Sequence, residues 1–342
     1  MIKIKKLTLI IVSIFFFISC KKEETQIVDN KILKEAPVSV KNGMLVFRDT
    51  LSFREYHQAA LKIGGTKGDL LPGFTSYRSV FNKIEEEYAN VKNQNEQDEF
   101  LKKYGSKILF NKDKSLSPIY SNLSLINFIN VEGKFMIGDQ LQILGQDSYI
   151  TIDNPTASKV TRALSMKKTD QAQGISIYKN EVVNLSNVSA KSFGNPMPTG
   201  LLKEVTYYNE DGKRRLFVQL RNDFVPGSGQ HMYMSFFQQA KGIFGGWSNN
   251  TTNLYFENLT AKGRLDIGKI PFSNDLPFFS PTMSGNWNDV NGPITFGIDF
   301  YLNQPNTPPL YTYYGVVHSL ILNGHFFSGG VPNTPNFTYE YN

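Results

Sequence analysis

The chain has 342 residues, of which 40% are hydrophobic, 13% aromatic and 19% charged, and it contains a single cysteine. This composition excludes a disordered chain, a collagen-like repeat and a multi-span membrane protein. One cysteine excludes both a disulfide framework and a cysteine-rich metal site. The formal charge is +6, but three lysines lie in the first six residues, and without them 33 basic residues face 30 acidic ones. Nucleic-acid binding needs a concentrated basic face, so this near balance argues against a nucleic-acid partner.

Residues 1–19 have the pattern of a signal peptide. A lysine-rich start precedes an apolar run over residues 7–18, which is too short to span a membrane comfortably. The run ends in Ser19-Cys20, which resembles a bacterial lipobox, although Phe17 stands where leucine is usual. The resemblance is to lipoproteins of Bacteroidota. It implies cleavage before Cys20 and acylation of its thiol, so that the lipid anchors the chain to a membrane. A simple secretory signal and an uncleaved anchor are the alternatives.

The charged segment after the cysteine indicates which side of the membrane the protein faces. Lys21-Lys22-Glu23-Glu24 resembles the export signal of surface-exposed lipoproteins in Bacteroidota. It predicts an outer-membrane lipoprotein that faces the cell exterior, with the periplasmic face as the alternative. A solvated linker is the other interpretation of this charge run. Residues 20–42 contain few large apolar side chains and are predicted to form a lipidated tether.

Residues 43–150 are predicted to form an α+β module. The run 44–47 predicts a strand, and Ser52 and Glu55 fit a capping box at the start of a helix that ends at Gly64 and Gly65. A second helix is expected over residues 77–91, where apolar side chains recur on one face. The polar residues 93–99 are expected to be a loop or a frayed end. Residues 123–131 and 134–144 are expected to be strands joined by a hairpin turn at Gly133.

Several short motifs of this module resemble a family of uncharacterised lipoproteins of Bacteroidota. They are Gly43-Met-Leu-Val-Phe47, Phe53, Gly73-Phe-Thr-Ser76, Asn130-Val-Glu-Gly133 and Ile137-Gly-Asp139. The resemblance covers roughly residues 40–145, and a weaker one continues from Phe236 to Trp247. It implies an address in the cell envelope and no activity, because none is established for such families.

The second half of the chain is predicted to be mainly β. Residues 151–200 are rich in Ser, Thr, Asn and Lys and are expected to be a connector with short strands. Residues 201–342 are expected to form a β-sandwich or jelly-roll-like domain, because short alternating runs are separated by Gly, Pro and Asn. Strands 201–208 and 214–221 flank a hairpin signal that ends at Gly212, and Leu216, Val218 and Leu220 share one face. Further strands are expected at residues 231–238, 254–259, 264–267, 294–300, 313–322 and 337–341.

No catalytic residue, metal site or cofactor is assigned from the sequence. His57 has no acidic residue at the spacing of a zinc site. A bent strand pair would let His318 and His325, seven residues apart, face each other, but a metal site would need a third ligand. Ordinary hydrogen-bonded histidines, His231 included, are the expected alternative. Ser228 lies in a glycine-rich segment that predicts a β-turn, not a nucleophile elbow. The main enzyme candidate is a carboxylate pair of the kind that glycosidases use. The acidic residues available for it are Glu257, Asp266, Asp275, Asp289, Asp299 and Glu340.

Two tryptophans suggest a glycan site. Trp247 and Trp287 each lie in a segment rich in Gly and Asn, which predicts loops, and Asn286 and Asp289 flank the second. A flat apolar ring beside amide and carboxylate groups suits a sugar, which stacks through its C–H face and is oriented through its hydroxyls. The alternative is that both rings plug loops onto the core. Asp49-Thr50-Leu51 also resembles an O-glycosylation sequon of Bacteroidota, in which Thr50 is the acceptor or, alternatively, a helix cap.

The sequence therefore predicts a surface-exposed outer-membrane lipoprotein that acts as a binding or interaction module. The expected partners are the membrane, through Cys20, and a glycan or an envelope protein. The alternatives are a polysaccharide hydrolase with a carboxylate pair and a structural subunit of an envelope assembly.

Overall fold

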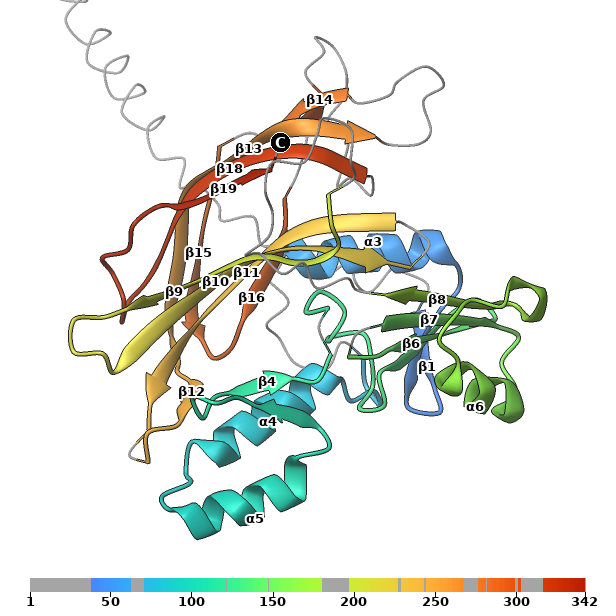
Figure 1. The fold of residues 1–342 in the computed structure, drawn as a ribbon, viewed down its shortest axis with the longest axis horizontal. Helices are drawn as coiled ribbons and strands as arrows, with labels where there is room; N and C mark the ends of the chain where they lie inside the picture. Colours follow the sequence, from blue (N-terminus) through green and yellow to red (C-terminus); the bar gives the residue numbers. More distant parts are fainter. Residues whose placement is uncertain are drawn as a thin grey trace, which may run out of the picture.

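Strands dominate the computed structural model, and within the described residues the α-helices all lie before residue 166 (Figure 1). The structure describes residues 38–62, 71–120, 122–146, 148–179, 197–226, 229–242, 244–266, 276–280, 282–298, 301–302 and 316–341. The predicted signal peptide, Cys20 and most of the predicted tether lie outside these ranges. The strands fall into three large sheets and one small hairpin, so the chain as a whole is mainly β.

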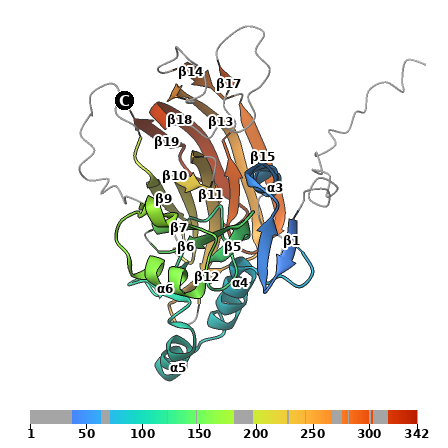
Figure 2. The same ribbon diagram turned by 90° about the vertical axis from the view of Figure 1, so that its right-hand side faces the viewer.

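The first sheet has the strand order β1-β2-β5-β6-β7-β8. Its strands are β1 (Val38–Lys41), β2 (Met44–Phe47), β5 (Lys134–Ile137), β6 (Gln140–Leu144), β7 (Ser148–Asp153) and β8 (Ile175–Lys179). Helices α3 (Thr50–Lys62), α4 (Tyr77–Tyr88) and α5 (Gln94–Tyr104) precede β5, and α6 (Ala157–Ser165) and the 3₁₀ turn η2 (Gln171–Gln173) lie between β7 and β8. One face of the sheet packs with α3 and α4, the other with α6, and Figure 2 shows α3 and α6 on opposite sides of it.

Two helix starts differ from the prediction, and both are explained by capping. The first helix begins at Thr50, because Asp49 Oδ1 accepts bonds from the backbone N and the Oγ of Ser52 at 2.8 and 2.7 Å. The predicted capping box at Ser52 is therefore wrong by one turn. The predicted loop at 93–99 is the first half of α5, which Asn93 caps by accepting from the Glu96 backbone N at 3.0 Å. This helix buries little apolar surface, so its hydrophobic period is faint.

The apolar run at 123–131 is not a strand. Residues 123–128 form tight turns in which Leu125, Ile126 and Phe128 are fully buried. A short apolar run is compatible with any element that is buried on all sides, so its periodicity cannot separate a strand from turns. The predicted strand 134–144 is two strands, β5 and β6, which reverse direction at Gly138 with φ +58°.

The predicted tether and connector both contribute strands. Val38–Lys41, placed in the tether, forms β1 and pairs antiparallel with β2. The boundary predicted at residue 150 falls inside β7, and the following residues supply α6 and β8, which complete the first sheet. Thr156 caps α6 by accepting from the Lys159 backbone N at 3.3 Å. This cap was not recognised in the sequence, because Ser and Thr are frequent throughout the segment.

The second and third sheets share one core. The second sheet has the order β12-β11-β10-β9 with β16 also on β11, and the third has β17-β14-β13-β18-β19 with β15 also on β13. Apolar side chains from both sheets belong to a single buried cluster, which includes Met234 from the second sheet and Phe256 and Leu320 from the third. The bounds are β9 (Gly200–Tyr208), β10 (Arg214–Val225), β11 (Gly229–Lys241), β12 (Trp247–Asn249), β13 (Thr252–Asp266), β14 (Leu276–Phe279), β15 (Met283–Val290), β16 (Ile294–Gly297), β17 (Tyr301–Leu302), β18 (Val316–Ser328) and β19 (Phe337–Tyr341).

Strand β10 divides its side chains between this shared core and the opposite face of the second sheet. Leu216, Val218 and Leu220 all lie in the core, as their predicted common face requires. The intervening residues of β10 point to the opposite face, which we call the outer face, and their register partners on β11 do the same. These pairs include Arg215 with Gln239 and Phe217 with Phe237. The N-terminal part of the chain packs against this outer face, which is where the candidate site lies.

Candidate functional site

A groove of about 430 Å³ lies between the outer face and the small hairpin formed by β3 (Ile108–Phe110) and β4 (Leu116–Pro118). The hairpin forms one wall and the sheet forms the floor. Amide, hydroxyl and carboxyl groups line the groove together with aromatic rings, a composition typical of ligand sites. The lining residues are Asn111, Lys112, Asp113, Ser115, Leu116 and Ser117 from the hairpin, and Glu204, Phe217, Gln219, Phe237 and Gln239 from the sheet.

Two phenylalanines form an aromatic platform in this groove. Phe217 on β10 and Phe237 on β11 are direct cross-strand partners, and their ring centroids lie 5.1 Å apart with an angle of 15° between the ring planes. Both side chains are half-buried. An aromatic pair on the face opposite the core is not needed to fill that core, and both rings line the groove, where a ligand can contact them.

Arg215 fastens the hairpin wall to the floor. Its Nη1 donates to Asp113 Oδ2 at 2.5 Å, and its Nε and Nη2 both donate to Gln239 Oε1, at 3.0 and 2.7 Å. The guanidinium also lies over the rings of Phe217 and Trp247, at 4.5 and 4.2 Å from their centroids. Partial burial opposes ionisation of Asp113, but hydrogen bonds from Ser115 and Arg215 lower the pKa of this carboxyl overall. Asp113 is therefore ionised and engaged at neutral pH.

The remaining polar groups are held in place by each other. Asn111 Nδ2 donates to the hydroxyls of Ser115 and Ser117 at 2.9 and 2.8 Å. On the floor, Gln219 Nε2 donates to Glu204 Oε2 at 2.6 Å, while Gln219 Oε1 has no hydrogen-bond partner among the described residues. The groove thus contains donors and acceptors that neighbouring side chains hold in fixed positions.

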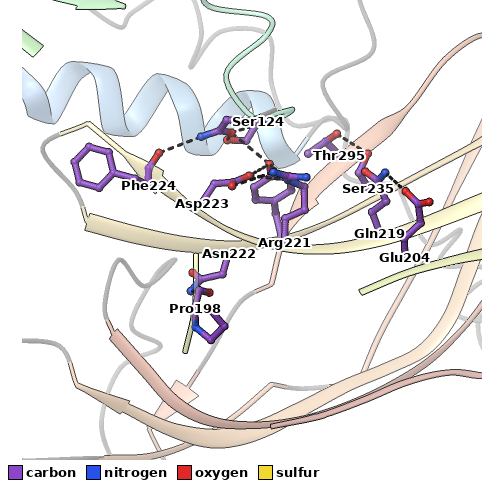
Figure 3. A network of polar contacts seen from close by, with 12 residues as sticks. Ser124, Pro198, Glu204, Gln219, Arg221, Asn222, Asp223, Phe224, Ser235 and Thr295 are labelled. Atoms are coloured by element: carbon purple, nitrogen blue, oxygen red, sulfur yellow. Dashed lines mark hydrogen bonds and ion pairs between the residues drawn. The ribbon is translucent and has the colours of Figure 1, made fainter. Parts of the chain in front are cut away.

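The other end of the outer face is closed by a buried polar network (Figure 3). Arg221 Nε and Nη2 donate to the two carboxylate oxygens of Asp223 at 2.8 and 3.2 Å, and the Tyr233 hydroxyl also donates to Asp223. Asn122 joins the network, because its Nδ2 donates to the Phe224 carbonyl at 3.0 Å and its Oδ1 lies 3.3 Å from the Tyr233 hydroxyl. Burial alone would lower the pKa of Arg221, but the charge of Asp223 raises that pKa overall.

A buried serine and two histidines extend this network. Ser124 Oγ lies 3.2 Å from His57 Nε2 and donates to Asn122 Oδ1 at 2.7 Å. The His57 and His231 rings meet edge to face with centroids 5.8 Å apart. Burial lowers the pKa of His231 to about 4 and that of His57 well below its usual range. Ser124 and both histidines are at most 1% exposed, so no substrate reaches the Ser124–His57 pair, and the network joins two parts of the fold.

The tryptophans predicted to contact a glycan are packed against other side chains. Trp247 is 6% exposed and lies on β12, where its ring contacts Arg215 and Tyr208. Trp287 lies on β15, and its ring stacks with Phe256 and Phe296 at 5.8 and 5.9 Å between centroids. The predicted loops are therefore strands, because Gly and Asn occur here within pairings to β11 and β13. The two rings belong to different sheets and do not form one site.

The structure places the other predicted residues apart from the groove. Asn286 and Asp289 are exposed on β15, and Thr50 is the half-buried first residue of α3. His318 and His325 lie on the same strand, β18, so they do not face each other across a strand pair. Of the acidic candidates, Asp275 and Asp299 lie outside the described residues. Within the described ranges, no three His, Cys, Asp or Glu side chains converge to hold a metal ion.

The groove residues were missed because the hairpin wall comes from a distant part of the sequence. Asp113 and Arg215 are 102 residues apart, and nothing local links them. The sequence did contain a signal for the sheet residues that form the floor of the groove. The alternation that places Leu216, Val218 and Leu220 in the core also places Phe217 on the opposite face. An aromatic residue at an outward position of a strand marks a surface that something covers.

Comparisons with known proteins give little further information. No protein-family model matches the chain, and no curated protein matches it. A weak structural neighbour is the crystal structure of a DUF4848 family protein from Bacteroides thetaiotaomicron, with 16% sequence identity and a TM-score of 0.26 over 89% of this chain and 99% of that chain. This neighbour is a Bacteroidota protein. In the part of the chain that the structure describes, no helix is long and apolar enough to cross a membrane.

Proposed function

We propose that this protein is an outer-membrane lipoprotein that binds a glycan in the groove beneath the β3–β4 hairpin. The observation that carries the proposal is the stacked pair Phe217–Phe237, which lies among amides, hydroxyls and a carboxylate. The flat ring faces match the apolar C–H face of a sugar ring, and the surrounding groups match its hydroxyls. The tryptophans proposed for this role from the sequence are replaced by these two phenylalanines.

The charges of the groove favour a neutral glycan. Asp113 is matched by Arg215 at 2.5 Å, and the remaining charged residues of the lining, Lys112 and Glu204, have opposite signs. Glu204 already accepts a hydrogen bond from Gln219. Since the lining together with Arg215 carries no net charge, it supplies no electrostatic preference for uronic or sialic acids.

The membrane part of the proposal rests on the sequence. The leader, Cys20 and the charges that follow it support lipidation and display at the cell surface. The division into an N-terminal α+β module and a C-terminal β-sandwich, with jelly-roll-like character, belongs to the same proposal. Protease treatment of intact cells, compared with a Cys20→Ser variant and a Lys21→Ala/Lys22→Ala/Glu23→Ala/Glu24→Ala variant, tests the address. Protection of the wild type in intact but not lysed cells would place the protein on the periplasmic face.

Native electrophoresis of the purified full-length chain in a non-ionic detergent tests the glycan site. Gels are cast with neutral polysaccharides (dextran, galactomannan, arabinoxylan, starch) or with acidic ones (polygalacturonate, hyaluronate). We expect at least one neutral polysaccharide to retard the wild type, and Phe237→Ala to lose most of this retardation, because stacking on an aromatic ring contributes roughly 1 kcal/mol or more.

The chain supplies a matched control for this variant. Tyr255 and Phe327 form a second stacked cross-strand pair, with centroids 4.9 Å apart, on the third sheet and away from the groove. Phe327→Ala therefore removes the same group from the same kind of pair and should bind as the wild type does. Equal binding by Phe237→Ala, with its thermal midpoint unchanged, would rule out the groove as the site.

Two alternative functions give different results in the same assay. A hydrolase would shorten the polysaccharide and release reducing ends, and Glu204→Gln would abolish that turnover. A structural subunit would give no retardation in any gel and would instead purify in a stable complex with another envelope protein.

A further inference from the structure

Tyr208 is an exposed aromatic side chain on the same sheet face as the groove. It ends β9, the edge strand of the second sheet, and is 55% exposed, more than any other aromatic residue that the structure describes. Its direct cross-strand partner on β10 is Arg215. Because direct partners lie on one face of a sheet, Tyr208 points to the outer face, as Arg215 does. An aromatic ring in this position is available to a ligand that reaches past the groove.

A run of packed side chains connects Tyr208 with the two phenylalanines of the groove. Its ring meets the ring of Trp247 at an angle of 65°, with centroids 6.1 Å apart. The Arg215 guanidinium lies between Trp247 and Phe217, at 4.2 and 4.5 Å from their ring centroids. Phe217 in turn stacks on Phe237. Trp247 is 6% exposed, so a buried ring holds Tyr208 in position. A tyrosine ring held in this way loses little conformational entropy when a ligand stacks on it.

The groove is too small for a polysaccharide chain and is closed at one end of the outer face. Its volume of about 430 Å³ is near the lower limit of ligand pockets, which range from about 300 to 1,000 Å³. Asp223 and Tyr233, both fully buried, belong to the network that closes the far end. Along β9, the alternate residues Glu204, Thr206 and Tyr208 follow the outer face in the other direction. Glu204 lines the groove, and four residues of strand, about 13 Å, separate it from Tyr208. A chain that leaves the groove along β9 therefore meets the Tyr208 ring.

We propose that Tyr208 forms a second sugar-binding platform outside the groove, and that the ligand is a neutral glycan chain longer than the groove. This inference rests on the proposed function and deepens it, because it names a polysaccharide or a long oligosaccharide as the ligand class in place of a mono- or disaccharide. One sugar ring stacks beside Phe237 in the groove and a later ring of the same chain stacks on Tyr208. Thr206, half-buried between the two positions, offers its hydroxyl to the sugars that link them.

Isothermal titration calorimetry with neutral oligosaccharides of increasing length tests the second platform. The full-length chain is kept in a polyoxyethylene detergent, which contains no sugar that could compete. The probes are isomalto-, manno-, xylo- and malto-oligosaccharides of two to six sugars. We expect the affinity of the wild type to keep rising up to the hexasaccharide in at least one series. Tyr208→Ala should weaken binding of that hexasaccharide about fivefold, the contribution of one aromatic contact, and leave binding of the disaccharide unchanged.

Two control variants separate stacking from other effects of the substitution. Tyr208→Phe keeps the ring and should bind every length as the wild type does. Tyr178→Ala removes a 39% exposed tyrosine from β8 that does not line the groove, and it should also bind as the wild type does.

The outcomes distinguish this inference from the proposed function. If the wild type binds, Phe237→Ala does not, and Tyr208→Ala keeps its affinity for the hexasaccharide, the second platform is wrong and the groove stands as the glycan site. An equal loss for the disaccharide and the hexasaccharide would also overturn the platform, because Tyr208 would then act only by supporting Trp247. No binding of any series by the wild type would overturn the proposed function and the second platform together.

Discussion

The two ends of the outer face carry the same kind of ion pair in different surroundings. At the groove end, Arg215–Asp113 joins β10 to the hairpin. At the closed end, Arg221–Asp223 lies within β10, and the contact with the N-terminal part of the chain is made through Asn122. At the closed end, the Arg221 and Asp223 side chains are 8% and 0% exposed. At the groove end, Arg215 is 3% exposed but its partner Asp113 is 45% exposed. Tyr233 and Asn122 complete the closed end, whereas solvent reaches the carboxylate at the groove end.

This difference shows how one sheet face can serve two purposes. The fully desolvated pair holds together the polar network against which Asn122 docks, and breaking it would leave a bare charge inside the protein. The half-exposed pair Arg215–Asp113 positions the hairpin beside the groove. Breaking this pair should cost less stability, because solvent screens the exposed carboxylate. The groove lies at the Arg215 end, between the hairpin that holds Asp113 and the floor formed by the sheet.

The largest expected effect comes from breaking the closed end. Asp223→Asn keeps the shape of the side chain but leaves Arg221 buried without a counter-charge, and we expect it to lower the free energy of unfolding by about 3–5 kcal/mol. Guanidinium chloride unfolding measures this loss. Asp139→Asn, at an exposed carboxylate in the turn between β5 and β6, is the control and should change stability by less than about 0.5 kcal/mol. A similar loss of unfolding free energy in both variants would mean that the buried Arg221–Asp223 pair contributes no more to stability than an exposed carboxylate does.

The two buried histidines of the closed end, His57 and His231, should make the stability of the fold sensitive to acid. Burial lowers the pKa of both His57 and His231, the latter to about 4, whereas in the unfolded chain histidine titrates near 6.5. Between these values the unfolded state binds more protons, so the free energy of unfolding falls as the pH drops from about 6.5 towards 4. Each histidine contributes at most about 1.4 kcal/mol per pH unit.

His231→Phe tests this sign, because it keeps a ring against Tyr233 and removes the titrating group. The difference between variant and wild type at pH 8 measures the change in packing, and only the further change between pH 8 and pH 5 reports titration. We expect the variant to lose roughly 1–2 kcal/mol less than the wild type over that interval. Parallel curves for the two proteins would show that His231 keeps an ordinary pKa in the folded state.

The sequence predicted what depends on neighbouring residues and missed what depends on distant ones. The strands at residues 201–208, 214–221 and 337–341 were correctly predicted, because alternation and hairpin signals are local. The shared face of Leu216, Val218 and Leu220 is likewise confirmed by their burial. The β3–β4 hairpin and its attachment to Arg215 were missed, because an ion pair between residues 102 apart leaves no periodic trace. A second link between the hairpin and the second sheet, from Trp247 N to the Lys114 carbonyl at 3.1 Å, is likewise distant in the sequence.

The smallest expected effect comes from loosening the groove end. Asp113→Asn removes a half-exposed ion pair, and solvent screening limits its contribution to about 1 kcal/mol. Arg215 also keeps its two bonds to Gln239, so the sheet itself should be unaffected. The hairpin should open more often, and trypsin should then cleave after Lys112 or Lys114 faster than in the wild type while the unfolding midpoint changes little. If Asp113→Asn instead cost as much stability as Asp223→Asn, the hairpin would be part of the fixed core, and the groove would be a fixed slot rather than a site with a movable wall.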